Sequence, residues 1–93
     1  MTQVVLSGRL ICVDDEHAAI VAQHLPRHIE LTRAEPGCVD FSVVQSDDPY
    51  VWRVDERFID QAAFDAHQRR VAGSEWGRAT VGIERDYTIR TED

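Results

Sequence analysis

The stretch 50–67 constrains the fold most, because it predicts a strand that passes almost directly into a capped helix. Aromatic and β-branched residues occupy alternate positions from 50 to 58, as in a strand with one buried face. Asp60 follows, and its carboxylate can accept hydrogen bonds from the free backbone N–H groups at the start of a helix. That helix then carries one apolar face, which contains Phe64, His67 and Val71.

Two polar side chains lie at positions where this pattern predicts burial. Glu56 lies in the apolar row of the strand, and His67 lies in the apolar stripe of the helix. A buried carboxylate or imidazole needs a polar partner, because leaving water without one costs free energy. Glu56 and His67 are therefore the first candidates for functional residues.

The remaining elements follow from the same two periodicities. Strands are predicted over 4–12, 39–45 and 83–90, and helices over 14–32, 60–72 and 74–81. Pro26 removes a backbone hydrogen bond and is expected to kink or split the first helix. Gly8 weakens its strand and marks either a bulge or a close approach by a ligand. The tail 91–93 is expected to fray.

The order strand, helix, strand, strand, helix, strand is typical of an α+β, ferredoxin-like βαββαβ sandwich. Four antiparallel strands would then carry both helices on one face. We expect one domain over residues 1–93. Charges of both signs mixed with valines and an isoleucine are predicted on the other face. That face is either solvated or pairs with a second copy, since a two-fold interface must be self-complementary.

Composition excludes several classes of partner. The formal net charge of −7 argues against a nucleic-acid backbone. The sequence contains no apolar run near the roughly 18 residues of a membrane-spanning helix, so we expect a cytoplasmic protein. Cys12 and Cys38 are too few for a disulfide framework and are expected to be unpaired.

Three histidines fall near one face of the first predicted helix: His17, His24 and His28. His24 and His28 have the i, i+4 spacing of metal ligands. Pro26 lies between them and no further His or Cys cluster accompanies them. We therefore expect a solvated face and no metal site.

Two segments resemble the antibiotic biosynthesis monooxygenase family. The first is Arg33-Ala34-Glu35-Pro36-Gly37-Cys38, followed by Phe41 and Gln45. The second is Glu56-Arg57-Phe58, followed by Ala63, Phe64 and His67. The resemblance implies a ferredoxin-like protomer that dimerises through its sheets into an α/β barrel, with a pocket between helices and sheet. Some members oxidise quinol- or anthrone-like compounds with molecular oxygen and no cofactor, others degrade haem, and some act on small signalling molecules without a clear oxygenase role.

His67 is the candidate catalytic base, because imidazole binds a proton near neutral pH. The alternative is a core histidine bonded to a backbone carbonyl or to Glu56. Glu56 is a second catalytic candidate, although an ion pair with Arg85, or with His67, is the favoured interpretation. The candidate substrate-binding residues are Trp52, Phe64, Trp76 and Arg85. Phe64 also suits the core, whereas Trp76 belongs to the irregular segment 73–81, where a lid would lie.

The function expected from these features is a homodimeric, cofactor-independent monooxygenase that acts on a quinol- or anthrone-like aromatic molecule and oxygen. The alternative is a dimer that binds or isomerises a small molecule without oxygen chemistry. Haem degradation is disfavoured. Relatives with that activity resemble one another in an Asn on the first strand, and this chain has no Asn. Those relatives also have a pocket Trp on the second helix, and at the corresponding position this chain carries His67.

Overall fold

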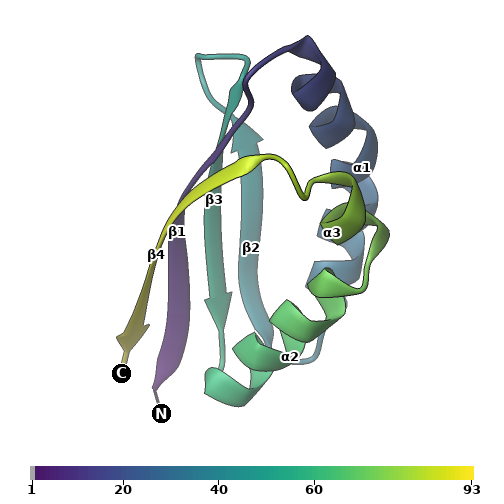
Figure 1. Cartoon of the computed structure of the whole chain (residues 1–93). Helices are drawn as coiled ribbons and strands as arrows, with labels where there is room; N and C mark the ends of the chain where they lie inside the picture. The colour runs from purple at the N-terminus through teal and green to yellow at the C-terminus, as the bar shows by residue number, and fades with distance from the viewer. Residues whose placement is uncertain (1) are drawn as a thin grey trace.

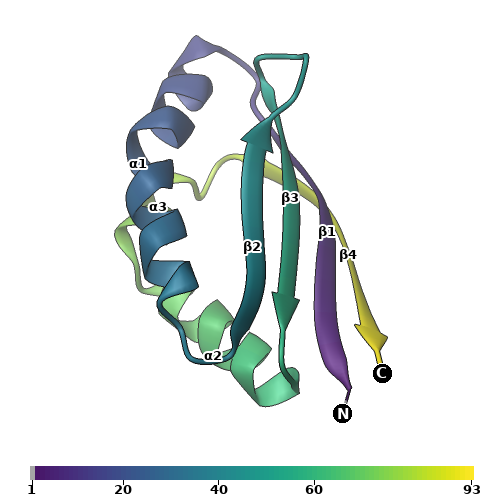
Figure 2. The same ribbon diagram turned by 180° about the vertical axis from the view of Figure 1, so that it is seen from behind.

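The protein is a four-stranded antiparallel sheet with all its helices on one face (Figures 1 and 2). The structure is a computed structural model, which describes residues 2–93. The strands are β1 (Gln3–Ile11), β2 (Cys38–Gln45), β3 (Val51–Phe58) and β4 (Glu84–Glu92). The helices are α1 (Asp15–Arg33), α2 (Gln61–Ala72) and α3 (Glu75–Ala79). The sheet order is β2-β3-β1-β4. The predicted ferredoxin-like α+β fold is therefore confirmed.

Each helix begins at a side chain that caps its free N–H groups. Asp14 accepts a hydrogen bond from the backbone N–H of His17 at 2.9 Å. Asp60 does the same for Ala63 at 2.8 Å, which fixes the start of α2 two residues after β3. The Ser74 hydroxyl caps α3. These short polar residues thus set where the chain changes from strand or loop to helix.

Pro26 was expected to kink or split the first helix, and it does not split it, because α1 runs as one helix through that residue. Pro26 lies on the exposed side of α1. The buried side carries Val21, Leu25, His28 and Thr32, on both sides of the proline. Packing of this stripe against the sheet holds the helix together, since tertiary contacts supply most helical stability in proteins.

Gly8 marks a close approach, but by a neighbouring strand rather than by a ligand. A Cβ atom built at this position would lie 2.1 Å from the carbonyl oxygen of Asp86 and 2.8 Å from the Cα of Tyr87. The pairing of β1 with β4 continues without interruption from Gln3 to Ile11, so there is no bulge at Gly8. Glycine is required here because β1 and β4 leave no space for a side chain.

Two predictions at the ends of strands were wrong. The register of β2 shifts between Cys38 and Asp40, and this bulge turns Val39 out of the apolar row, so that it is 49% exposed. The tail does not fray before residue 93, because Thr91 and Glu92 belong to β4. Glu92 pairs with Gln3 across the strands and accepts hydrogen bonds from Arg57 and Arg90.

The outer face of the sheet, opposite the helices, combines ion pairs with apolar side chains. Arg9 donates to Asp86 at 2.6 Å, and Arg57 donates to Glu92 at 3.1 Å. Val44 is 59% exposed on this face. A shallow hollow crosses the strands there, lined by Val5, Ser7, Asp40, Ser42, Asp55, Glu56, Arg57 and Arg90.

Cys12 and Cys38 are both unpaired, as expected. None of the helices within residues 2–93 has the length and apolar character needed to cross a membrane.

Candidate active site

The imidazole of His67 lies between two carboxyl groups, in the space between the helices and the sheet. Its Nδ1 is 3.0 and 3.1 Å from the two carboxylate oxygens of Glu35, in the loop that joins α1 to β2. Its Nε2 is 3.6 Å from Oε1 of Glu56, on β3. Both His67 and Glu56 are buried, at 2% and 8% exposure. The α2 stripe and the β3 row thus bring the two predicted residues face to face.

Glu35 fixes the tautomer of His67. Its carboxylate accepts a hydrogen bond from Nε of Arg70 at 2.6 Å, so a positive charge compensates it. Arg70 in turn donates to Oγ1 of Thr32 at 2.9 Å, which orients the guanidinium. Because a carboxylate can only accept, Nδ1 of His67 carries the proton and donates it to Glu35. The lone pair of Nε2 is then free on the side that faces Glu56.

Burial shifts the pKa values of both facing groups towards their neutral forms. It lowers the pKa of His67, although the hydrogen bond and the negative charge of Glu35 oppose this. It raises the pKa of Glu56 to about 7, and the charge of Glu35 adds to the effect. Near pH 7 a neutral imidazole therefore faces a carboxyl group that exchanges its proton readily, which is the condition for general acid–base chemistry.

Oε1 of Glu56 has no hydrogen-bond partner within residues 2–93. Its distance of 3.6 Å from Nε2 of His67 is too long for a direct hydrogen bond. Both groups therefore keep hydrogen-bonding capacity that a ligand beside them could use.

A cavity of about 50 Å³ adjoins these two groups. Its polar lining residues are His28, Glu56, His67, Gln68, Arg85 and Tyr87, together with the Trp76 indole. Its apolar lining residues are Leu6, Leu10, Phe41, Val43, Val54 and Val71. The volume suits a small molecule such as dioxygen, whereas pockets for drug-sized ligands measure roughly 300–1,000 Å³. We call this space the inner cavity.

The structure gathers four of the six predicted site residues around the inner cavity: Glu56, His67, Trp76 and Arg85. The other two, Trp52 and Phe64, are not among its lining residues. Both are buried in the hydrophobic core, where Phe64 packs against Phe58 with ring centroids 5.7 Å apart. The catalytic and binding roles predicted for these residues remain predictions.

The ion pair expected between Glu56 and Arg85 does not form. Arg85 instead donates to the carbonyl oxygens of Thr80 and Ile83, at 3.0 and 2.9 Å, and to the Thr80 hydroxyl at 2.7 Å. The turn between α3 and β4 folds back over the strand and satisfies the guanidinium locally. The nearer partner for Glu56 is His67, which was the second candidate.

His28 corrects the prediction of a solvated histidine face. It is 5% exposed and lies in the buried stripe of α1. Its ring stacks on the indole of Trp76, with centroids 4.5 Å apart and planes within 2°, and meets Phe41 edge-on at 5.3 Å. His17 and His24 are partly exposed. Within residues 2–93, no group of three His, Cys, Asp or Glu side chains is placed to hold a metal ion.

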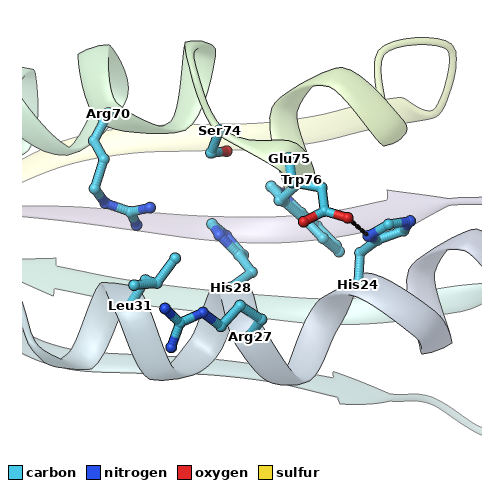
Figure 3. A pocket seen from close by; sticks show the side chains of 8 residues that line it. All are labelled: His24, Arg27, His28, Leu31, Arg70, Ser74, Glu75 and Trp76. Atoms are coloured by element: carbon cyan, nitrogen blue, oxygen red, sulfur yellow. Dashed lines mark ion pairs between the residues drawn. The ribbon is translucent and has the colours of Figure 1, made fainter.

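A second pocket, of about 100 Å³, is also bordered by the His28–Trp76 stack (Figure 3). We call it the outer pocket. It lies between α1 and the segment that joins α2 to α3, and its lining residues are His24, Arg27, His28, Leu31, Arg70, Ser74, Glu75 and Trp76. His28 and Trp76 line both spaces. The stacked pair thus borders both spaces.

Comparison with known proteins agrees with this architecture. SnoaB, a cofactor-independent oxygenase from Streptomyces nogalater, superposes with a TM-score of 0.81 at 14% identity, over 100% of this chain and 95% of its own. Rv0793 from Mycobacterium tuberculosis superposes with a TM-score of 0.69 at 26% identity, over 100% and 94%. PA3566 from Pseudomonas aeruginosa superposes with a TM-score of 0.73 at 22% identity, over 99% of this chain and 93% of its own. These likenesses show the fold.

No curated protein matches the sequence. The sequence model of the family described as antibiotic biosynthesis monooxygenase, however, matches residues 5–77. That range holds both resembling segments, together with His67 and the two carboxyl groups of Glu35 and Glu56 beside it. The chain therefore belongs to the antibiotic biosynthesis monooxygenase family.

Proposed function

We propose that this protein is a cofactor-independent monooxygenase of quinol- or anthrone-like aromatic molecules, with His67 as the base. The observation that carries the proposal is the imidazole itself. Glu35 holds its Nδ1–H, and its Nε2 is free beside the inner cavity, which polar and apolar side chains line in similar number. Membership of the family and the likeness to SnoaB, a cofactor-independent oxygenase, support this function.

The reaction can be written for an anthrone, in which a CH₂ group becomes a carbonyl. His67 Nε2 takes a proton from the substrate, and Glu35 stabilises the imidazolium that forms. The electron-rich anion gives one electron to dioxygen, and the resulting radical and superoxide combine to form a C–O bond. A proton from Glu56 or His67 reaches the outer oxygen, which leaves with a second substrate proton as water. One oxygen atom remains as the carbonyl.

Oxygen uptake tests this proposal. Metal-stripped protein is given 9-anthrone or a quinol in an oxygen electrode, with a protein-free blank for autoxidation. We expect His67→Gln to lose about 10²- to 10⁴-fold in rate, the usual contribution of a general base. Glu35→Gln should lose less and should shift the pH–rate profile, because the glutamine does not stabilise the imidazolium.

The matched control is His17→Gln, since His17 is a partly exposed histidine on α1 that lines neither pocket. It should leave the rate unchanged. A normal rate in His67→Gln would remove His67 from the mechanism.

A second candidate function rests on the same pair of groups. A neutral imidazole and a carboxyl group with a pKa near 7, 3.6 Å apart, can also move a proton between two atoms of a substrate without oxygen. This would make the protein isomerase-like. Incorporation of deuterium from solvent into a bound enol or phenol under anaerobic conditions, with no oxygen uptake in air, would favour this function.

We further propose a homodimer formed through the outer face of the sheet. The ion pairs and exposed valine on that face are compatible with a self-complementary interface. The hollow at its centre gives the second copy a place to pack.

A further inference from the structure

The inner cavity holds the reactive groups but has no room for an aromatic ring. Glu56 and His67 line it, yet its volume is about 50 Å³. An aromatic substrate must therefore gain space from a side chain that borders the cavity. The structure contains one such side chain with a matching shape, because the Trp76 indole is itself a flat system of two fused rings.

Trp76 lies on a flat platform that another ring could use. Its indole is parallel to the imidazole of His28, with centroids 4.5 Å apart. His28 is held in turn by the edge contact with Phe41. Its pKa is lowered to about 3, chiefly by burial, so its ring is neutral and suited to stacking with another neutral ring.

Few polar contacts hold Trp76 in place. It belongs to α3, a helix of five residues that starts beyond Gly73. The single ion pair or side-chain hydrogen bond that joins α3 to α1, within residues 2–93, is that between Glu75 and His24, at 3.5 Å (Figure 3). The Glu75 side chain is 74% exposed, so this contact is weak. The Trp76 side chain is 7% exposed and is otherwise held by apolar packing and by its stack on His28.

Glu56 offers a polar anchor at the inner end. Its Oε1 is buried and has no hydrogen-bond partner in the described part of the chain. Buried acceptors are rarely left unpaired in native proteins, because the loss of hydration is then uncompensated. A phenolic hydroxyl in the inner cavity would donate to this oxygen and would lie beside Nε2 of His67.

We propose that the inner cavity and the outer pocket are two halves of one binding site for a planar phenol of two or more fused rings. The ligand enters through the outer pocket, takes the place of the Trp76 indole against His28, and directs its hydroxyl to Glu56 and His67. His28 is the stacking platform of this site. The proposal rests on the proposed function for the position of the reactive groups, but it requires no oxygen chemistry.

Anaerobic calorimetric titration with 2-naphthol tests this site. His28→Ala removes the platform and should weaken binding about tenfold, the upper range for one aromatic pair. His28→Phe retains a flat ring and should bind within about threefold of the wild type. Trp76→Ala removes the group to be displaced and should bind 2-naphthol at least as tightly as the wild type. His17→Ala, at a partly exposed position of α1 outside both pockets, is the matched control and should change nothing.

The outcomes separate this inference from the oxygenase proposal. Tenfold weaker binding in Trp76→Ala, with the fold retained by circular dichroism, would show that Trp76 is a fixed wall and would overturn the inference. The inference would also be overturned if His28→Phe and His28→Ala lost the same affinity for 2-naphthol, or if the wild type did not bind 2-naphthol. If the wild type bound 2-naphthol but took up no oxygen, the result would contradict only the proposed oxygenase function.

Discussion

At the residue scale, two glutamates beside one histidine have different environments. Glu35 is paired with Arg70 and receives the Nδ1 proton of His67. Glu56 is buried without a counter-charge, which raises its pKa from 4.5 to about 7. Environment rather than residue type thus assigns one carboxylate to orientation and leaves the other free to exchange a proton.

The raised pKa of Glu56 predicts a pH-dependent stability difference between the wild type and Glu56→Gln. Below pH 4.5 Glu56 is protonated in both the folded and the unfolded chain, so its ionisation does not change the free energy of unfolding. Between about 4.5 and 7 it ionises only when unfolded, and folding loses stability as pH rises. From pH 5 to 8.5, the advantage of Glu56→Gln should grow by about 2–3 kcal/mol.

Urea denaturation at the two pH values measures this difference. Glu84→Gln, the same substitution at an exposed position of β4, should show no such trend. A difference between wild type and Glu56→Gln that stays constant with pH would mean that Glu56 is ionised and paired in the folded protein.

The residues around the site differ in how far sequence could predict them. Glu56 and His67 interrupt regular apolar patterns, so burial could be inferred from periodicity alone. Glu35 lies in a loop, where no period says which way a side chain points, and it was named only as part of a segment that resembles the family. His28 follows Leu25 by three positions in the buried stripe, a signal that was available. Arg85 was misassigned because a turn, not a strand, supplies its partners.

At the element scale, α1 tolerates Pro26 because its buried face is continuous. The proline has no N–H to donate to the carbonyl of Ala22, and its ring crowds that carbonyl. We expect Pro26→Ala to raise the free energy of unfolding by about 1–3 kcal/mol, since an interior proline costs about 3 kcal/mol relative to alanine in an unsupported helix. Chemical denaturation measures the gain, and Gln23→Ala, also exposed on α1, provides the baseline.

A gain no larger than that of Gln23→Ala would mean that α1 accommodates the ring without strain.

Local signals set most element boundaries correctly, because caps and turns act within a few residues. The exceptions, the bulge at Val39 and the pairing of Thr91 with Val4, depend on a strand distant in sequence. No local pattern encodes that pairing.

At the scale of the whole molecule, we predict that the outer face of the sheet forms the interface of a homodimer. Light scattering at micromolar concentration should give twice the mass of one chain. Ser7→Arg places a long charged side chain in the central hollow and should shift the protein towards monomer. Gln23→Arg makes the same addition of charge on the far side of the molecule and should remain dimeric. A monomeric wild type would contradict the proposed interface.

The close approach at Gly8 also bears on what a damaged form of this protein would do. β4 is an edge strand, and its one neighbour in the sheet is β1. Any side chain at position 8 would meet the backbone of β4 and push the two strands apart. The unpaired N–H and C=O groups of β1 would then be exposed along a long apolar strand. Such an edge recruits strands from other molecules, so Gly8 protects the protein from aggregation as much as from unfolding.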